Sequence, residues 1–81
     1  MFLKEFKERI DKLIEKQYNG YITFEYCVEE CNKIVDEYKN FLFGYSIFED
    51  CDTEKENLKR TNKLRMYMLN QLMGLLINEN E

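Results

Sequence analysis

The chain has 81 residues, enough for one domain but not for two, and 44% of them are apolar, which is enough for a hydrophobic core. It contains no His, so the commonest general base and the commonest metal ligand are both missing, and the sequence predicts a protein that is not an enzyme. The net charge of −4 disfavours direct binding of nucleic acid, because phosphate contacts need clustered Lys and Arg.

The first predicted element is a helix over residues 2–18. Its apolar residues recur at steps of three and four and fill one arc of about 160° at 100° per residue. They are Phe2, Phe6, Ile10, Leu13, Ile14 and Tyr18. Asn19-Gly20 is expected to end this helix, because Gly adopts the left-handed conformation that helix C-termini use.

A second helix is predicted over residues 24–42, with Thr23 as its N-cap. Glu25, Glu29 and Asp36 lie on the face opposite its apolar residues. Residues 21–50 hold seven acidic and two basic side chains, so the negative charge of the protein is concentrated on this part of the chain. An acidic face of this kind favours association with a basic target.

An aromatic connection is predicted over residues 43–52, folding back over the core. A third helix follows over residues 54–77, and Thr53 with Glu56 has the spacing of a capping box at its start. The apolar residues of this helix span roughly 220° of its circumference, whereas an ordinary surface helix needs little more than 100°. The excess is either the interior of a bundle, a dimer seam or a binding surface for another protein, and the pattern does not decide between them.

The three cysteines, Cys27, Cys31 and Cys51, are expected to be reduced thiols in a cytoplasmic protein. The paired Cys-x-x-Cys spacing of a zinc site is absent. A calcium loop over residues 15–26 is also unfavoured, because Tyr26 stands where a bidentate Glu is required. We therefore expect neither a metal nor a cofactor, and no segment is apolar for long enough to cross a membrane.

A basic cluster opens the third helix, with no acidic residue inside it. Its members are Lys59, Arg60, Lys63 and Arg65. One interpretation is a contact with phosphate or with an acidic partner. The other is a solvated helix face, or pairing with the acidic second helix.

These patterns predict an all-α protein, a compact antiparallel three-helix bundle formed by residues 1–81 as one domain, with the third helix at its centre. The expected function is that of a small non-enzymatic interaction protein, which binds another protein and inhibits or modulates it. The expected partner-binding residues are Met66, Leu69, Met73, Ile77, Glu25, Glu29 and Asp36. The partner is expected to be a protein, for which a basic nucleic-acid-binding surface is one candidate, and a homodimer through the third helix is a further possibility.

The residue usage indicates a type of source genome. The chain is rich in Lys, Asn, Ile, Phe and Tyr and contains no Ala, which is typical of an AT-rich genome such as that of a low-GC bacterium or its phage. In that setting one expected role is counter-defence, as an anti-CRISPR-like inhibitor. The alternatives are a bacteriocin-immunity-like helical protein and a small DNA-binding regulator that uses the basic cluster.

Overall fold

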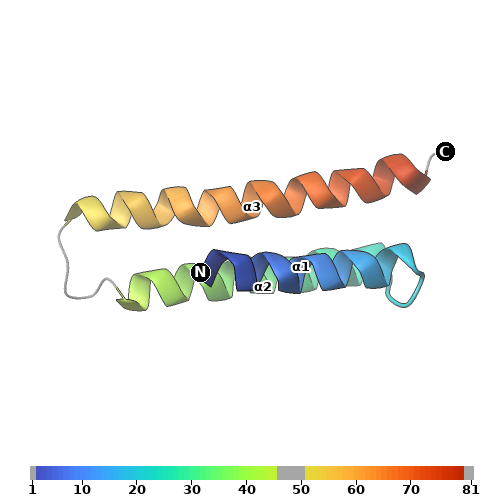
Figure 1. Ribbon diagram of the computed structural model, residues 1–81, viewed down its shortest axis with the longest axis horizontal. Coiled ribbons are helices and arrows are strands. Elements are labelled where there is room, and N and C mark those ends of the chain that lie inside the picture. Colours follow the sequence, from blue (N-terminus) through green and yellow to red (C-terminus); the bar gives the residue numbers. More distant parts are fainter. Residues whose placement is uncertain (1, 46–50, 80–81) are drawn as a thin grey trace.

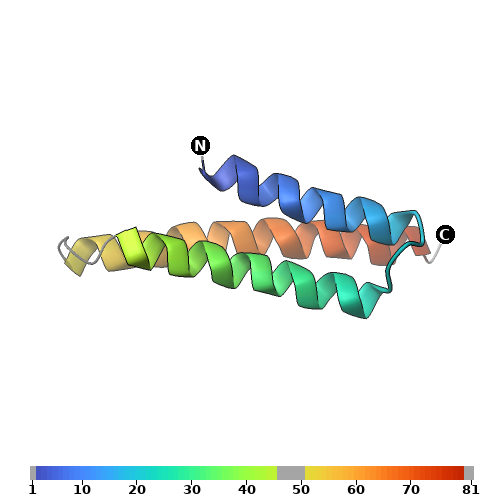
Figure 2. The same cartoon turned by 90° about the horizontal axis from the view of Figure 1, so that it is seen from below.

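The computed structural model describes residues 2–45 and 51–79, with side chains described for residues 3–44 and 55–76. The described residues form three α-helices: α1 over Phe2–Tyr18, α2 over Phe24–Tyr45 and α3 over Cys51–Glu79. Helices that follow one another in the chain run in opposite directions, and all three lie side by side along the long axis of the bundle (Figures 1 and 2). The predicted all-α three-helix bundle is therefore confirmed.

The turn between α1 and α2 follows from local sequence signals. Gly20 has a φ of +83°, which is a left-handed conformation. This conformation is unfavourable for residues that have a Cβ atom, but Gly adopts it readily. The Tyr21 N–H donates to the Lys16 carbonyl at 2.9 Å, and the Gly20 N–H donates to the Gln17 carbonyl at 3.0 Å. These two bonds make a Schellman motif, which satisfies carbonyl groups that the end of α1 leaves without intrahelical donors.

Thr23 caps the start of α2, as predicted. Its Oγ1 accepts a hydrogen bond from the Tyr26 N–H at 3.1 Å, which is the N3 contact of an N-cap residue. We expect Thr23→Ala to lower the free energy of unfolding by about 1 kcal/mol, because one N–H at the helix start loses its acceptor. Urea denaturation followed by circular dichroism measures this loss. Thr23→Ser is the control, since it retains the accepting oxygen and should stay close to the wild type.

The core contains one stripe from each helix, and its fully buried side chains include Ile10 of α1, Val35 of α2 and Leu64 of α3. Phe6 packs on Tyr38 with ring centroids 5.0 Å apart, which joins α1 to α2 through a tilted aromatic contact. Each helix contacts both of the others. We expected α3 to lie at the centre of the bundle. Instead, the three helices are mutual neighbours, and α1 and α2 cover only one side of α3.

The ends of α2 and α3 differ from their predicted bounds. The helix α2 continues three residues past the predicted end, through Gly44 to Tyr45, and α3 begins at Cys51 instead of residue 54. Gly44 weakens a helix by roughly 1 kcal/mol but does not break it, and no Pro stands near either end. Residues 43–45 and 51–52 of the predicted connection are therefore helical, and its remaining residues, 46–50, lie outside the described residues.

Thr53 is not the N-cap of α3, contrary to the predicted capping box. The backbone of Thr53 is already helical, and Glu56 instead pairs with Arg60 one turn later, with 3.6 Å between Glu56 Oε2 and an Arg60 guanidinium nitrogen. A residue inside the first turn cannot act as the non-helical cap.

Candidate interaction surface

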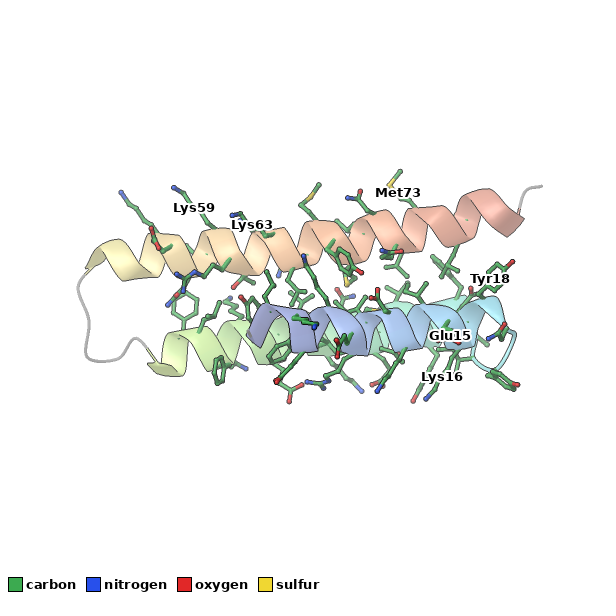
Figure 3. All side chains as sticks on the ribbon, viewed as in Figure 1. Glu15, Lys16, Tyr18, Lys59, Lys63 and Met73 are labelled. Atoms are coloured by element: carbon green, nitrogen blue, oxygen red, sulfur yellow. The ribbon has the colours of Figure 1, made fainter. Side chains whose placement is uncertain are left out.

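The outward side of α3 carries four large apolar side chains that no other described helix covers. Met66 is 57% exposed, Leu69 41%, Met73 58% and Leu76 44%. Their spacing of three, four and three residues places them along one line on the helix. We call these four residues the apolar stripe. Figure 3 shows Met73 pointing away from α1 and α2.

The structure places three of the four predicted apolar contact residues, Met66, Leu69 and Met73, in this stripe. The side chain of the fourth, Ile77, lies outside the described side chains. Leu76 belongs to the stripe and was not predicted, and Leu58 is also exposed, at 44%. A helical wheel shows that the apolar arc is too wide but does not show which part the neighbouring helices cover, so these two residues could not be assigned from the sequence.

The basic cluster divides into two pairs. Arg60 pairs with Glu56, and Arg65 donates a hydrogen bond to the Asn62 side chain at 3.4 Å, so both arginines have partners within α3. Lys59 and Lys63 point away from the bundle on the outward side of the same helix (Figure 3). They flank a shallow groove of about 540 Å³, whose lining is Lys59, Asn62, Lys63, Met66, Tyr67 and Asn70. The four cations therefore do not form one continuous site.

Glu25, Glu29 and Asp36 are exposed on α2, as predicted. None of the ion pairs in the described part of the chain includes them. Two other acidic residues of this helix are paired: Glu37 with Arg9 of α1 at 2.6 Å, and Glu30 with Lys33 at 3.1 Å. The three predicted acids thus keep their charge available to a partner.

The apolar stripe lies on the side of the bundle formed by α2 and α3. Tyr67 marks the side of α3 that faces α1, because its hydroxyl donates a hydrogen bond to Asp11 of α1 at 2.5 Å. Leu69 and Leu76 are two and nine residues further on, which at 100° per residue is about 200° and 180° around the helix. They therefore lie opposite the α1 side, toward α2.

Two acidic residues of α2, Glu25 and Glu29, lie on this same side. Glu37 marks the side of α2 that faces α1, and Leu42 marks the side that faces α3, since its carbonyl accepts a hydrogen bond from Asn57 of α3. Glu25 and Glu29 lie between these two markers on the exposed surface, about 120° and 80° around the helix from Glu37. The acids and the apolar stripe therefore share one surface.

The height of the acids along the bundle follows from the Asn57–Leu42 hydrogen bond, which joins antiparallel helices at 3.2 Å. Equal numbers of residues counted from this bond along α2 and α3 place Glu25 and Glu29 beside residues 66–76. We call Glu25 and Glu29 the acidic edge. Asp36, counted in the same way, lies beside the basic cluster instead.

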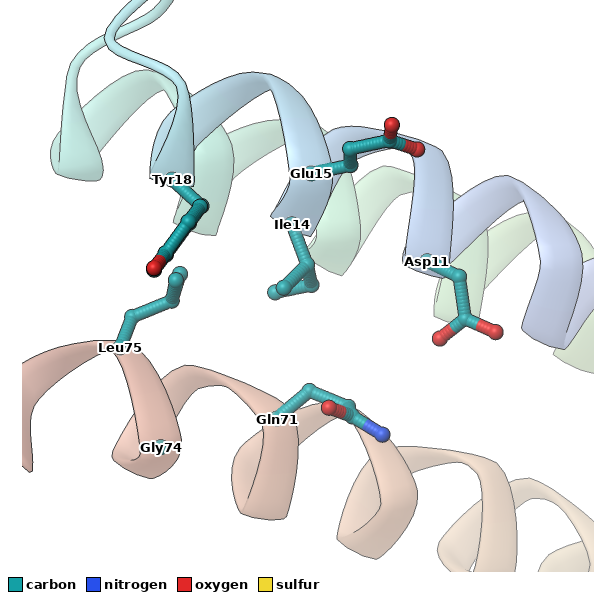
Figure 4. Close-up of a pocket in the computed structure, with 7 residues that line it drawn as sticks. All are labelled: Asp11, Ile14, Glu15, Tyr18, Gln71, Gly74 and Leu75. Carbon is teal, nitrogen blue, oxygen red and sulfur yellow. The ribbon is translucent and has the colours of Figure 1, made fainter. Parts of the chain in front are cut away.

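A second groove, of about 350 Å³, runs between α1 and α3 (Figure 4). Its lining is Asp11, Ile14, Glu15, Tyr18, Gln71, Gly74 and Leu75. Asp11 already accepts the hydrogen bond from Tyr67, and this bond, followed by burial, raises the pKa of the Tyr67 hydroxyl. Lys7 lies over the same ring at 4.9 Å. Asp11 thus links this groove to an internal contact between α1 and α3.

Cys27 and Cys31 are buried free thiols in the core. Burial raises the pKa of both thiols, and that of Cys31 reaches about 12, helped by the nearby Cys27 and Glu30. The thiolate is the nucleophile and metal-binding form of cysteine, so neither side chain is activated at neutral pH. The side chain of Cys51 lies outside the described side chains.

We expect these two thiols to resist alkylation in the folded protein. In a Cys51→Ser background, excess iodoacetamide at pH 8 should leave Cys27 and Cys31 unmodified over the time in which free glutathione reacts completely. Both thiols should react once urea is added. Mass spectrometry counts the added groups, and rapid labelling of either thiol without denaturant would contradict the burial of Cys27 and Cys31 in the core.

Among the described residues, no cluster of three or more His, Cys, Asp and Glu side chains has the arrangement of a metal site. No described helix combines the length and apolar character needed to cross a membrane. Comparison of the chain with protein-family models, with curated protein sequences and with solved structures finds no match.

Proposed function

We propose that this protein is a small non-enzymatic interaction protein that binds another protein, and inhibits or modulates it, through the surface formed by α2 and α3. The observation that supports this proposal is the apolar stripe. Four large apolar side chains in one line remain exposed on a helix whose other side already completes the core. Contiguous apolar surface of this kind is typical of protein interaction sites.

The chemistry of the stripe suits this role. Two of its four residues, Met66 and Met73, are methionines, whose unbranched and polarisable side chains adapt to the shape of a partner. The acidic edge beside the stripe would steer a basic protein surface toward it and speed association. A phage or mobile-element inhibitor of a nucleic-acid-binding host protein, or an immunity protein against a bacteriocin, would fit both features.

The test combines capture of a partner with substitutions in the stripe. The tagged protein is used to purify its partner from host lysate, and the molar mass of the complex gives the stoichiometry. Leu69→Asp and Met73→Asp should each remove the partner, because a buried unpaired carboxylate at an interface costs several kcal/mol. Circular dichroism should show an unchanged helical fold, since both positions are exposed.

Asn70→Asp is the matched control, because it adds the same charge to an exposed position of α3 outside the stripe. This variant should retain the partner. If the Leu69 and Met73 variants retain it as well while folded, or if all three variants lose it equally, the proposed surface is wrong.

A DNA-binding regulator is the second candidate, and the outward-pointing pair Lys59 and Lys63 is the observation that favours it. Binding of generic duplex DNA that weakens as salt is raised, and that Lys59→Glu with Lys63→Glu abolishes, would support this function. If the protein does not shift the mobility of DNA at low salt, this second function is excluded.

A further inference from the structure

We infer that the partner presents a basic amphipathic helix, which lies along the α2–α3 side with its apolar residues on the stripe and its Lys or Arg residues beside Glu25 and Glu29. This inference rests on the proposed function and specifies the chemistry of the partner. It follows from how charge is distributed around the stripe.

The half of α3 that carries the stripe has no charge of its own, since residues 66–78 contain no acidic or basic side chain. On α2, the exposed acidic residues beside this half are Glu25 and Glu29, and no ion pair in the described part of the chain includes either. A ligand that covers the stripe therefore meets negative charge along its α2 edge, while the cations Lys63 and Arg65 lie just before its first residue, Met66. A helix with apolar residues on one face and basic residues beside them is complementary to it.

The stripe also fits a helix in length and spacing. From Met66 to Leu76 it spans about 15 Å at 1.5 Å per residue, which three turns of a partner helix would cover. Its steps of three, four and three residues are those of a helix–helix seam, in which side chains of one helix fit between those of the other. An extended segment would not match this spacing, because its side chains alternate with a period of two.

A second copy of the chain fits the same surface poorly. In an antiparallel dimer through the stripe, the twofold axis places α2 of both copies on the same side of the seam, so the two acidic edges face each other. In a parallel dimer, each residue faces its own counterpart, so Lys59 opposes Lys59 and Lys63 opposes Lys63. Like charges repel in both arrangements, whereas a basic partner meets opposite charge.

Lipid and nucleic acid are disfavoured for a related reason. The acidic edge would repel the phosphate groups of anionic membranes and of DNA at the apolar half of the surface. The outward lysines Lys59 and Lys63 lie beyond that half, toward the start of α3. Phosphate binding at these lysines would therefore leave the stripe uncovered.

The test uses synthetic peptides with the wild-type protein. The probe is a peptide of about 18 residues with leucines at steps of three and four and lysines beside them. One control peptide replaces every lysine by glutamate, and a second keeps the composition but scatters the leucines. We expect saturable binding of the basic peptide in isothermal titration calorimetry at low salt, weaker binding at high salt, and none of either control.

Protein variants then test the acidic edge and the stripe separately. Glu25→Gln with Glu29→Gln should weaken binding of the basic peptide about five- to tenfold at low salt, because two exposed charges are lost at the edge of the interface. Glu5→Gln with Glu8→Gln removes the same charge from exposed positions of α1 and should have no such effect. Met73→Asp should abolish binding of the peptide.

The outcomes separate this inference from the proposed function. If the basic peptide does not bind, or if the α1 and α2 variants weaken it equally, the partner is not a basic helix on this side. Capture of the host partner that still depends on Leu69 and Met73 would then leave the proposed function standing. A concentration-dependent dimer lost in Met73→Asp, or vesicle binding through the stripe, would overturn the inference in favour of that other occupant.

Discussion

Leu64→Ala is expected to lower the free energy of unfolding by about 3 kcal/mol, whereas Leu69→Ala, five residues further along the same helix, should change it by less than about 0.5 kcal/mol. Leu64 is fully buried in the core, while Leu69 is 41% exposed. Removing a buried leucine loses its transfer free energy and leaves a cavity. A small domain has little stability in reserve, so Leu64→Ala should be partly unfolded at 37 °C.

Urea denaturation of both variants, followed by circular dichroism at several protein concentrations, measures this difference. The comparison is matched, because the same atoms are removed from the same helix. Equal destabilisation by the two substitutions would mean that the outward side of α3 is covered in solution. A midpoint that also rises with protein concentration would identify the cover as self-association.

Asn57→Ala is expected to have the second largest effect, a loss of about 2 kcal/mol in the free energy of unfolding. Asn57 is 2% exposed, and its Nδ2 donates a hydrogen bond to the Leu42 carbonyl at 3.2 Å. The substitution removes a buried donor and the volume of the side chain together, and both changes are costly in a packed interior. The loss should appear in urea denaturation of the purified variant.

Asn62→Ala is the control for this prediction, because Asn62 is exposed on the same helix and should be nearly neutral. Hydrogen exchange adds a local measurement: amides near Leu42 should exchange faster in Asn57→Ala than those near Ile10. If Asn57→Ala is as stable as the wild type, the bond between α2 and α3 does not fix their register.

The sequence predicted the helices because apolar periodicity and local signals agree along most of the chain. The end of α1 follows from Gly20, and the start of α2 follows from Thr23, since each determines backbone geometry within a few residues. Where such signals compete, the observed helix ends differ from the predicted ones. Gly44 and Thr53 look like boundaries but lie inside helices, because the helical conformation continues through both positions.

The candidate surface was less predictable, because it depends on which side of each helix its neighbours cover. The wheel of α3 indicated excess apolar surface, but the wheel alone does not place Leu76 outside and Leu72 inside. Contacts between residues far apart in the chain could not be predicted from the sequence either. The hydrogen bond between Tyr67 and Asp11 joins positions 56 residues apart, and it identifies the side of α3 that faces α1.

The division of α3 into a core side and an open side has a consequence for how this protein changes over generations. Residues such as Leu64 and Met68 hold the bundle together, while Met66, Leu69 and Met73 lie outside the packed interior. Under the proposed function, mutations at the second set would alter what the protein recognises without first being filtered by misfolding. A lineage under pressure from a changing target would retain the first set and diversify the second, and a laboratory library randomised at the same positions would be expected to yield folded binders with new specificities.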